Sequence, residues 1–158
     1  MSTRTQIRIF SKVENSVKSI DLYHHHDGYP EGVGFDLVTR LSQMRNWYVS
    51  EIANTLIKDV KDEYELTLGN HTDVDYLYEI DTNEQTVTCF RFGYNKYCEA
   101  TNNSNGNETL DIFDFKGYRC FSFKLSDHAE ETIESIKKAN AEGYESINTL
   151  LTDLLKIE

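Results

Sequence analysis

The residues best suited to chemistry are gathered in one segment, 23–34, which reads YHHHDGYPEGVG. In a strand that continues through the histidines, His25 and Asp27 share one face, and His24 and His26 lie on the other. Three interpretations stay open: Asp27 orients His25 as a general base, the pair ligates a metal, or Asp27 caps the next turn while His25 bonds the backbone. Metal binding is the weakest of these, because His24 and His26 point away and no third ligand has a suitable spacing. We therefore expect no metal and no cofactor.

The loop after the histidines has an unusual composition. Three glycines and the only proline of the chain fall within residues 27–34. Glycine permits a positive φ and proline fixes φ near about −65°, so we expect an ordered loop in which Gly28 adopts a positive φ. The ring and hydroxyl of Tyr29 suit a ligand platform. The Gly-x-Gly before the next helix weakly resembles an anion site, but Asp36 in the first helical turn would repel an anion.

Arg4 joins this motif through an expected hairpin. Residues 5–10 alternate apolar and polar side chains, and a second strand runs from residue 17 to about 26 after a short polar turn. Antiparallel pairing then places Arg4 beside His25 and Asp27, where its guanidinium pairs with Asp27 or meets an anionic ligand. We assign no catalytic residue. The predicted ligand-binding residues are Arg4, Tyr23, His25, Asp27, Gly28 and Tyr29.

The first 45 residues carry a resemblance to a known family. The chain begins Met-Ser-Thr-Arg and continues into Tyr-His-His-His-Asp-Gly-Tyr-Pro-Glu-Gly. It resembles small phage- and prophage-associated proteins, which start Met-Ala/Ser-Thr-Arg and contain Tyr-x-His-Trp-Asp-Gly-Tyr-Pro-x-Gly; His26 stands where those proteins have Trp. The resemblance implies a bacterial mobile element and the cytoplasm of its host, with a counter-defence role, and it implies no particular reaction.

The elements that must position the motif follow from periodicity. Apolar residues at helical spacing predict a helical segment over about 35–60, as one bent helix or as two. Strand patterns and polar turns predict a mostly antiparallel sheet, and two helices end the chain. We expect one α+β domain over residues 1–158. The further expected elements are strands at 64–68, 75–80 and 86–92, an exposed loop at 100–109, a hairpin of 110–115 with 118–125, and helices from about 127 and from 144.

The composition limits the possible partners. The chain has 158 residues and a formal net charge of −11, which argues against nucleic-acid backbones and anionic membranes as targets. The many strand aromatics are ordinary strand formers with few basic neighbours, so they do not predict a nucleic-acid platform. No apolar segment suggests a signal peptide or a membrane span, and three cysteines without metal-like spacing suggest a reducing compartment. The leucine stripe of the last helix predicts core, with a homodimer surface as the alternative.

Two functions of different classes fit these observations. The first is a non-enzymatic binding protein that neutralises a host factor or sequesters a small, nucleotide-like ligand through the His-Asp-Gly-Tyr-Pro loop. The second is a hydrolase that uses His25 and Asp27 as an acid–base pair, although the chain has no GxSxG, HExxH or P-loop motif. In a third interpretation the motif is purely structural and holds the hairpin to the first helix. We favour the binding protein.

Overall fold

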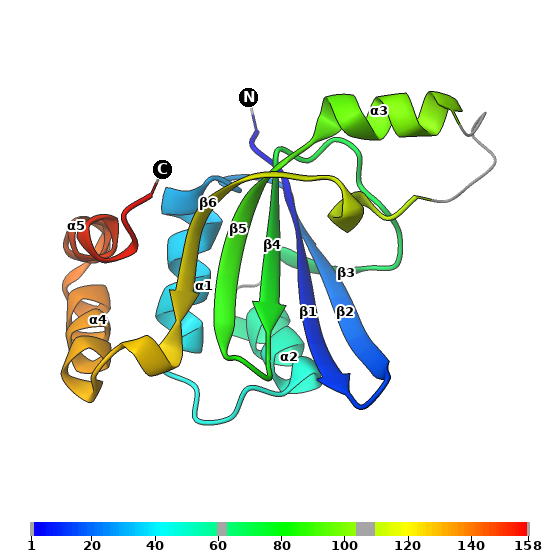
Figure 1. Cartoon of the computed structure of the whole chain (residues 1–158). Helices are drawn as coiled ribbons and strands as arrows, with labels where there is room; N and C mark the ends of the chain where they lie inside the picture. The colour runs from blue at the N-terminus through cyan, green and yellow to red at the C-terminus, as the bar shows by residue number, and fades with distance from the viewer. Residues whose placement is uncertain (1, 60–62, 104–109, 158) are drawn as a thin grey trace.

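The computed structural model describes residues 2–59, 63–103 and 110–157. Its centre is a six-stranded sheet in the order β3-β2-β1-β4-β5-β6 (Figure 1). Neighbouring strands are antiparallel except β1 and β4, which are parallel. The strands are β1 (Thr5–Val13), β2 (Ser16–His24), β3 (Tyr64–Thr67), β4 (Tyr76–Asp81), β5 (Thr86–Phe92) and β6 (Lys116–Lys124).

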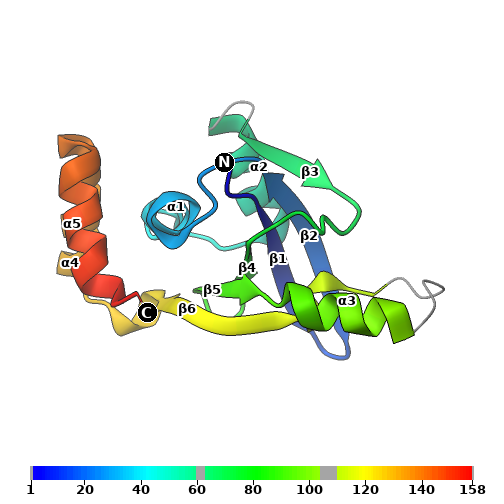
Figure 2. The same cartoon turned by 90° about the horizontal axis from the view of Figure 1, so that it is seen from above.

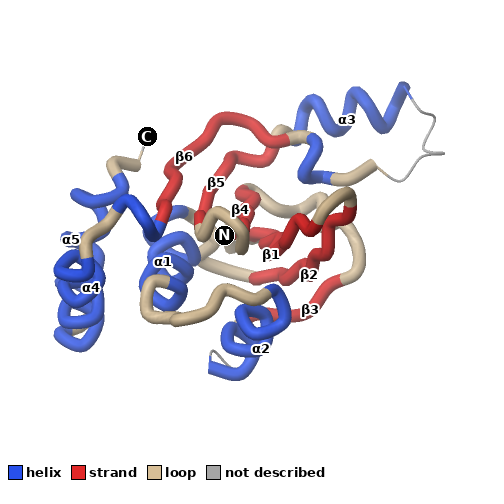
Figure 3. Tube along the Cα trace, turned by 60° about the horizontal axis from the view of Figure 1, so that its bottom comes forward, coloured by secondary structure: helices blue, strands red, loops and turns tan. Residues whose placement is uncertain are grey.

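Four of the five α-helices that the described residues form lie on one side of the sheet. Seen from above, α1 stands between the sheet and the pair α4–α5 (Figure 2), and from below it lies between that pair and α2 (Figure 3). The fifth helix, α3, follows the C-terminal end of β5 and projects away from the sheet (Figure 1). The helices are α1 (Phe35–Leu41), α2 (Val49–Asp59), α3 (Tyr94–Asn103), α4 (Glu130–Glu142) and α5 (Tyr144–Leu155), and short turns of helix occupy η1 (Pro30–Gly34), η2 (Ile112–Asp114) and η3 (Leu125–Asp127).

Alternation in the first hairpin builds the core. Ile7, Ile9 and Leu22 are fully buried against the helices, whereas Tyr23 belongs to a second apolar cluster on the other face. Thr5 pairs with His24 at the open end of the hairpin. The predicted α+β class, the N-terminal hairpin and the two C-terminal helices are therefore confirmed.

The central helical segment is two helices. Leu41 ends α1, and the indole Nε1 of Trp47 donates to the Leu41 carbonyl at 3.2 Å. Trp47 is buried, so it folds the connection back onto the core before α2 begins at Val49. Of the two arrangements left open by the sequence, the bent single helix is thus excluded.

Two local expectations are wrong. Residues 110–115 do not form a strand, because the Asp111 side chain accepts a hydrogen bond from the Phe113 N–H and starts the short helix η2; β6 pairs with β5 instead. The loop expected at 100–109 is helical through Asn103, the end of α3, and residues 104–109 lie outside the described part of the chain.

The apolar stripe of the last helix, α5, packs into the core of the same chain. Ile147, Leu151 and Leu155 are buried in the main core, and Leu150 and Leu154 pack against it. The expectation of core is therefore confirmed, and a homodimer through this helix stays a prediction. Among the described residues, no helix has the length and apolar character needed to cross a membrane.

Candidate functional site

Backbone contacts clamp the loop that follows β2. The Gly28 N–H donates to the Thr3 carbonyl at 2.9 Å, and the Tyr78 hydroxyl donates to the Gly28 carbonyl at 2.7 Å. One turn later, the Val33 N–H donates to the Asp27 carbonyl at 2.8 Å. The loop is therefore ordered by the start of β1, by β4 and by its own η1 turn.

The predicted positive φ at Gly28 was wrong. Asp27, with φ of 53°, is the residue in the left-handed region, and Gly28 has no positive φ. Asp27 tolerates this conformation better than most residues. Gly28 is required for close approach, because a Cβ there would lie 3.0 Å from the Thr3 carbonyl oxygen and 3.0 Å from the Thr5 Cβ.

Tyr23 is the centre of an aromatic cluster on the sheet face away from α1 and α2. Its ring stacks on His71 at 3.9 Å between centroids and meets the edge of His25 at 4.6 Å. Its hydroxyl donates to Asp73 at 2.9 Å. Burial, together with this carboxylate, raises the pKa of Tyr23 to about 12, so the phenol stays protonated.

The charged members of this cluster are paired with one another. His25 Nε2 lies 2.8 Å from Glu65 Oε1, and Arg4 Nε lies 3.5 Å from Asp73. Arg4 and His25 thus both belong to the surroundings of Tyr23, but the carboxylate partner of Arg4 is Asp73 rather than Asp27. His25 likewise has Glu65, not Asp27, as its carboxylate.

Asp27 and Tyr29 lie on the other side of the motif. Because β2 ends at His24 and the chain turns at Asp27, strand parity does not extend to Asp27. The Tyr29 hydroxyl donates to Asp27 at 3.2 Å, and burial followed by this contact raises the pKa of Tyr29. The six predicted ligand-binding residues thus form two groups, Arg4, Tyr23 and His25 on one side and Asp27 and Tyr29 on the other, with the Gly28 backbone between them.

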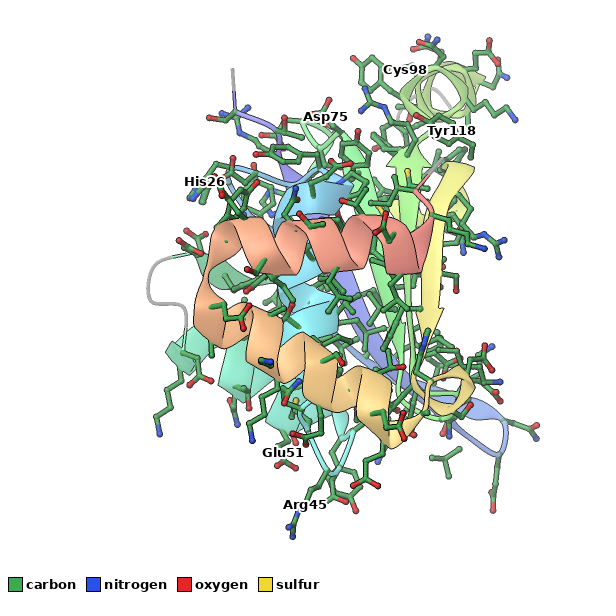
Figure 4. The ribbon with its side chains drawn as sticks, turned by 90° about the vertical axis from the view of Figure 1, so that its left-hand side faces the viewer. His26, Arg45, Glu51, Asp75, Cys98 and Tyr118 are labelled. Atoms are coloured by element: carbon green, nitrogen blue, oxygen red, sulfur yellow. The ribbon has the colours of Figure 1, made fainter. Side chains whose placement is uncertain are left out.

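Three adjacent cavities run along α1 on the helix side of the sheet, and they share lining residues. The first, about 300 Å³, is bounded by α1, α4 and α5. The second, about 340 Å³, lies mainly between α1 and α2, and the third, about 190 Å³, lies where β2 ends and β3 begins. Asp36 lines all three, so we treat them as one α1 groove. Figure 4 looks onto α4 and α5, and His26, which lines the third cavity, appears near the end where they join.

The α1 groove is strongly acidic. Arg40 is the one lysine or arginine that lines these three cavities among the described residues, and it lies 2.9 Å from Asp36 and 3.9 Å from Asp59. Asp36 also accepts from the Tyr64 hydroxyl at 2.6 Å, so its orientation is fixed. The five lining carboxylates are Asp27, Glu31, Asp36, Asp59 and Glu63.

His24 forms part of the wall of the third cavity, with little contact with solvent. Only 3% of it is exposed, and its Nδ1 has no hydrogen-bond partner. Its Nε2 lies 3.7 Å from a Glu63 oxygen, which is longer than a hydrogen bond. Burial lowers the pKa of His24, and the backbone of His26 and the nearby carboxylates oppose this only in part. At neutral pH the ring is therefore uncharged, and one of its nitrogens is available as a hydrogen-bond acceptor.

Potential metal ligands are dispersed over the described residues, and two of the three thiols are buried. In the described ranges, no three His, Cys, Asp or Glu side chains are placed to hold a metal ion. The three cysteines are free, and Cys89 and Cys120 are buried. Burial raises the pKa of Cys89, which keeps it a neutral thiol.

Sequence reasoning found the motif but not the groove. Parity placed His24 on the inner face, and the four-residue spacing of Asp36 and Arg40 is a visible helical ion pair. Glu63 and Tyr64 gave no local signal, because they reach the groove only through the pairing of β3 with β2.

Comparison with known proteins gives no family for this chain. No protein-family model, no curated protein and no solved structure matches it.

Proposed function

We propose that this is a non-enzymatic binding protein that takes a lysine- or arginine-rich segment of a partner protein in its α1 groove. The observation that carries the proposal is the lining of three adjacent cavities by five carboxylates and one already paired arginine. A partner with positive charge completes that field. The net charge of −11 acts in the same direction at long range and favours rapid encounter with a basic partner.

The first cavity adds a surface for the apolar stems of such side chains. Phe35 and Ile147 form buried wall, and Tyr144, which is 69% exposed, also lines the cavity. An aromatic face beside the carboxylates of Glu31 and Asp36 suits a cation, because the ring face attracts positive charge. Lysine and arginine side chains match both halves of this surface, since they combine an apolar stem with a charged head.

A nucleotide-like ligand, considered from the sequence, fits less well. Its phosphates would enter a groove dominated by carboxylates, and Arg4, the cation expected to meet them, is paired with Asp73 on the other side of the motif. The resemblance to phage-associated proteins makes a host protein the expected source of the basic segment. A counter-defence role in the bacterial cytoplasm is part of this proposal.

Calorimetry with synthetic peptides tests the proposal. A peptide of alternating lysine and glycine should bind the full chain, and its affinity should fall as salt rises, because screening weakens charge pairing. A glutamate–glycine peptide should not bind. Equal binding of both peptides would refute a cation-selective groove.

Matched charge variants locate the binding site. The double variant Glu31→Gln, Asp59→Asn removes two groove carboxylates and should weaken the lysine peptide by about tenfold, which corresponds to about 1.4 kcal/mol. The control Glu14→Gln, Glu134→Gln removes the same charge from exposed positions that line none of the three cavities. If the two double variants weaken binding equally, the effect is net charge alone and the groove is not the site.

A further inference from the structure

The third cavity of the groove, which we name the His24 pocket, has a different construction from the other two. Its wall includes a buried histidine and a buried tyrosine, His24 and Tyr64, both 3% exposed. Its remaining polar lining includes carboxylates from three separate segments, Asp27 after β2, Asp36 on α1 and Glu63 before β3. Groups from so many segments converge on about 190 Å³, a space smaller than a drug-sized ligand requires. The pocket therefore suits one side chain.

His24 supplies an independent sign of a missing partner. Buried polar atoms in proteins are nearly always hydrogen-bonded, and an exception calls for an explanation. The Nδ1 of His24 has no hydrogen-bond partner, the backbone of His26 acts on the ring, and the Nε2 faces Glu63 across 3.7 Å, too far for a direct hydrogen bond. A hydrogen-bond donor bound between the Nε2 of His24 and the Glu63 carboxylate would have an acceptor on each side when Nε2 is the unprotonated nitrogen of the neutral ring.

Hydrogen bonds within the protein already orient the carboxylate oxygens around the pocket. Asp36 accepts from Arg40 through Oδ1 and from Tyr64 through Oδ2, so both of its oxygens are oriented. Asp27 accepts from Tyr29 through Oδ1. This preorganisation leaves the carboxylates in place before a ligand arrives, which reduces the cost of binding.

We infer that the His24 pocket is the specificity pocket of the groove and holds the primary ammonium group of a single lysine side chain. The inference rests on the proposed function and names the group that the groove selects. An ammonium is compact and carries three donors that point in different directions, which matches acceptors arranged around a small space. A guanidinium is planar and wider, so it fits the two larger cavities better. Carboxylates and phosphates are repelled by Asp27, Asp36 and Glu63.

The test uses NMR of the histidine rings in the full chain, with capped single amino acids as probes. Nα-acetyl-lysine methylamide should shift the His24 ring signals in a saturable way. The arginine analogue should bind several-fold more weakly, and the norleucine analogue, which lacks the charge, should give no shift. Equal binding of lysine and arginine, or saturable shifts with sodium or magnesium ions alone, would overturn the assignment to a primary ammonium.

Two neighbouring glutamates give a matched pair of variants. Glu63→Gln should weaken the lysine probe by about tenfold. Glu65→Gln makes the same charge change two residues away, but Glu65 pairs with His25 on the far side of β2, so binding should stay within about twofold. Both glutamates are about half exposed, which keeps loss of folding out of the comparison. Equal effects of the two variants would refute the pocket.

The outcomes separate this inference from the proposed function. If the lysine–glycine peptide binds and Glu63→Gln does not weaken it, the groove stands and the pocket assignment fails. If the capped lysine binds in the His24 pocket but no basic peptide does, the pocket stands and the proposed function fails.

Discussion

Replacing Gly32 by alanine should destabilise the protein, because it displaces the loop that joins the histidine motif to the α1 groove. A Cβ on Gly32 would overlap the Asp27 carbonyl oxygen, and a backbone atom cannot rotate away as a side chain can. That oxygen also accepts from the Val33 N–H at 2.8 Å. Loss of the hydrogen bond costs about 1 kcal/mol, and forced movement of a packed loop costs about 1–3 kcal/mol. Alanine also restricts the unfolded chain, which offsets about 0.4–1 kcal/mol of the lost stability.

The expected net loss is about 2 kcal/mol, which is about 4–8 °C in Tm for a chain of this length. Urea unfolding followed by circular dichroism measures it. Gly69→Ala is the control, because a Cβ there meets nothing within 4 Å and φ is not positive, so its stability should be unchanged or slightly higher. If Gly32→Ala unfolds at the same urea concentration as the wild type, the loop is soft and the clamp described above does not hold it.

Three further predictions follow from buried polar groups. Burial lowers the pKa of His24, so as the pH falls the unfolded chain takes up a proton before the folded chain does. Folding stability should therefore be full above about pH 6.5 and should fall below it by at most about 1.4 kcal/mol per pH unit. His24→Phe should flatten this part of a profile of urea midpoint against pH. Tyr78→Phe removes the donor to the Gly28 carbonyl and should cost about 1–2 kcal/mol by urea unfolding; an unchanged midpoint would show that another donor serves this carbonyl. Arg8→Met leaves the Asp21 carboxylate, only 15% exposed, with Gln6 as a donor but no cation, and should cost about 3 kcal/mol; adding Asp21→Leu should recover part of that loss, and no recovery would mean that packing or the lost Asp111 pair dominates.

The fold was predictable where the pattern is local. Alternation over residues 5–10 gave the first strand and its buried face, and helical spacing gave the last two helices. The parallel pairing of β1 with β4 joins Thr5 to Tyr76, and neither strand carries a local mark of that register. The α3 helix has no buried residue, so no packed apolar face marks it in the sequence, and no helix was predicted directly after Phe92.

Strand alternation predicted the faces of the histidines correctly but failed at Asp27. The ring contacts of Tyr23 with His25 and of His24 with His26 confirm the two faces predicted for the histidines. The alternation fails at Asp27, because a residue with positive φ reverses the chain and ends the strand period. The Asp-Gly pair and the following proline do mark a turn here, which is the interpretation in which Asp27 caps the loop rather than facing His25.

The motif and the groove are connected through the loop backbone. Asp27 and Gly32 line the His24 pocket, and their positions depend on the bonds that tie Gly28 to Thr3 and Tyr78. The glycines and the proline thus shape a wall rather than approach a ligand. The same sequence feature, Asp36 at the first turn of α1, that argued against an anion site becomes the residue common to all three cavities. Because its charge repels anions and its two oxygens are already oriented, that residue favours a cation as the groove's ligand.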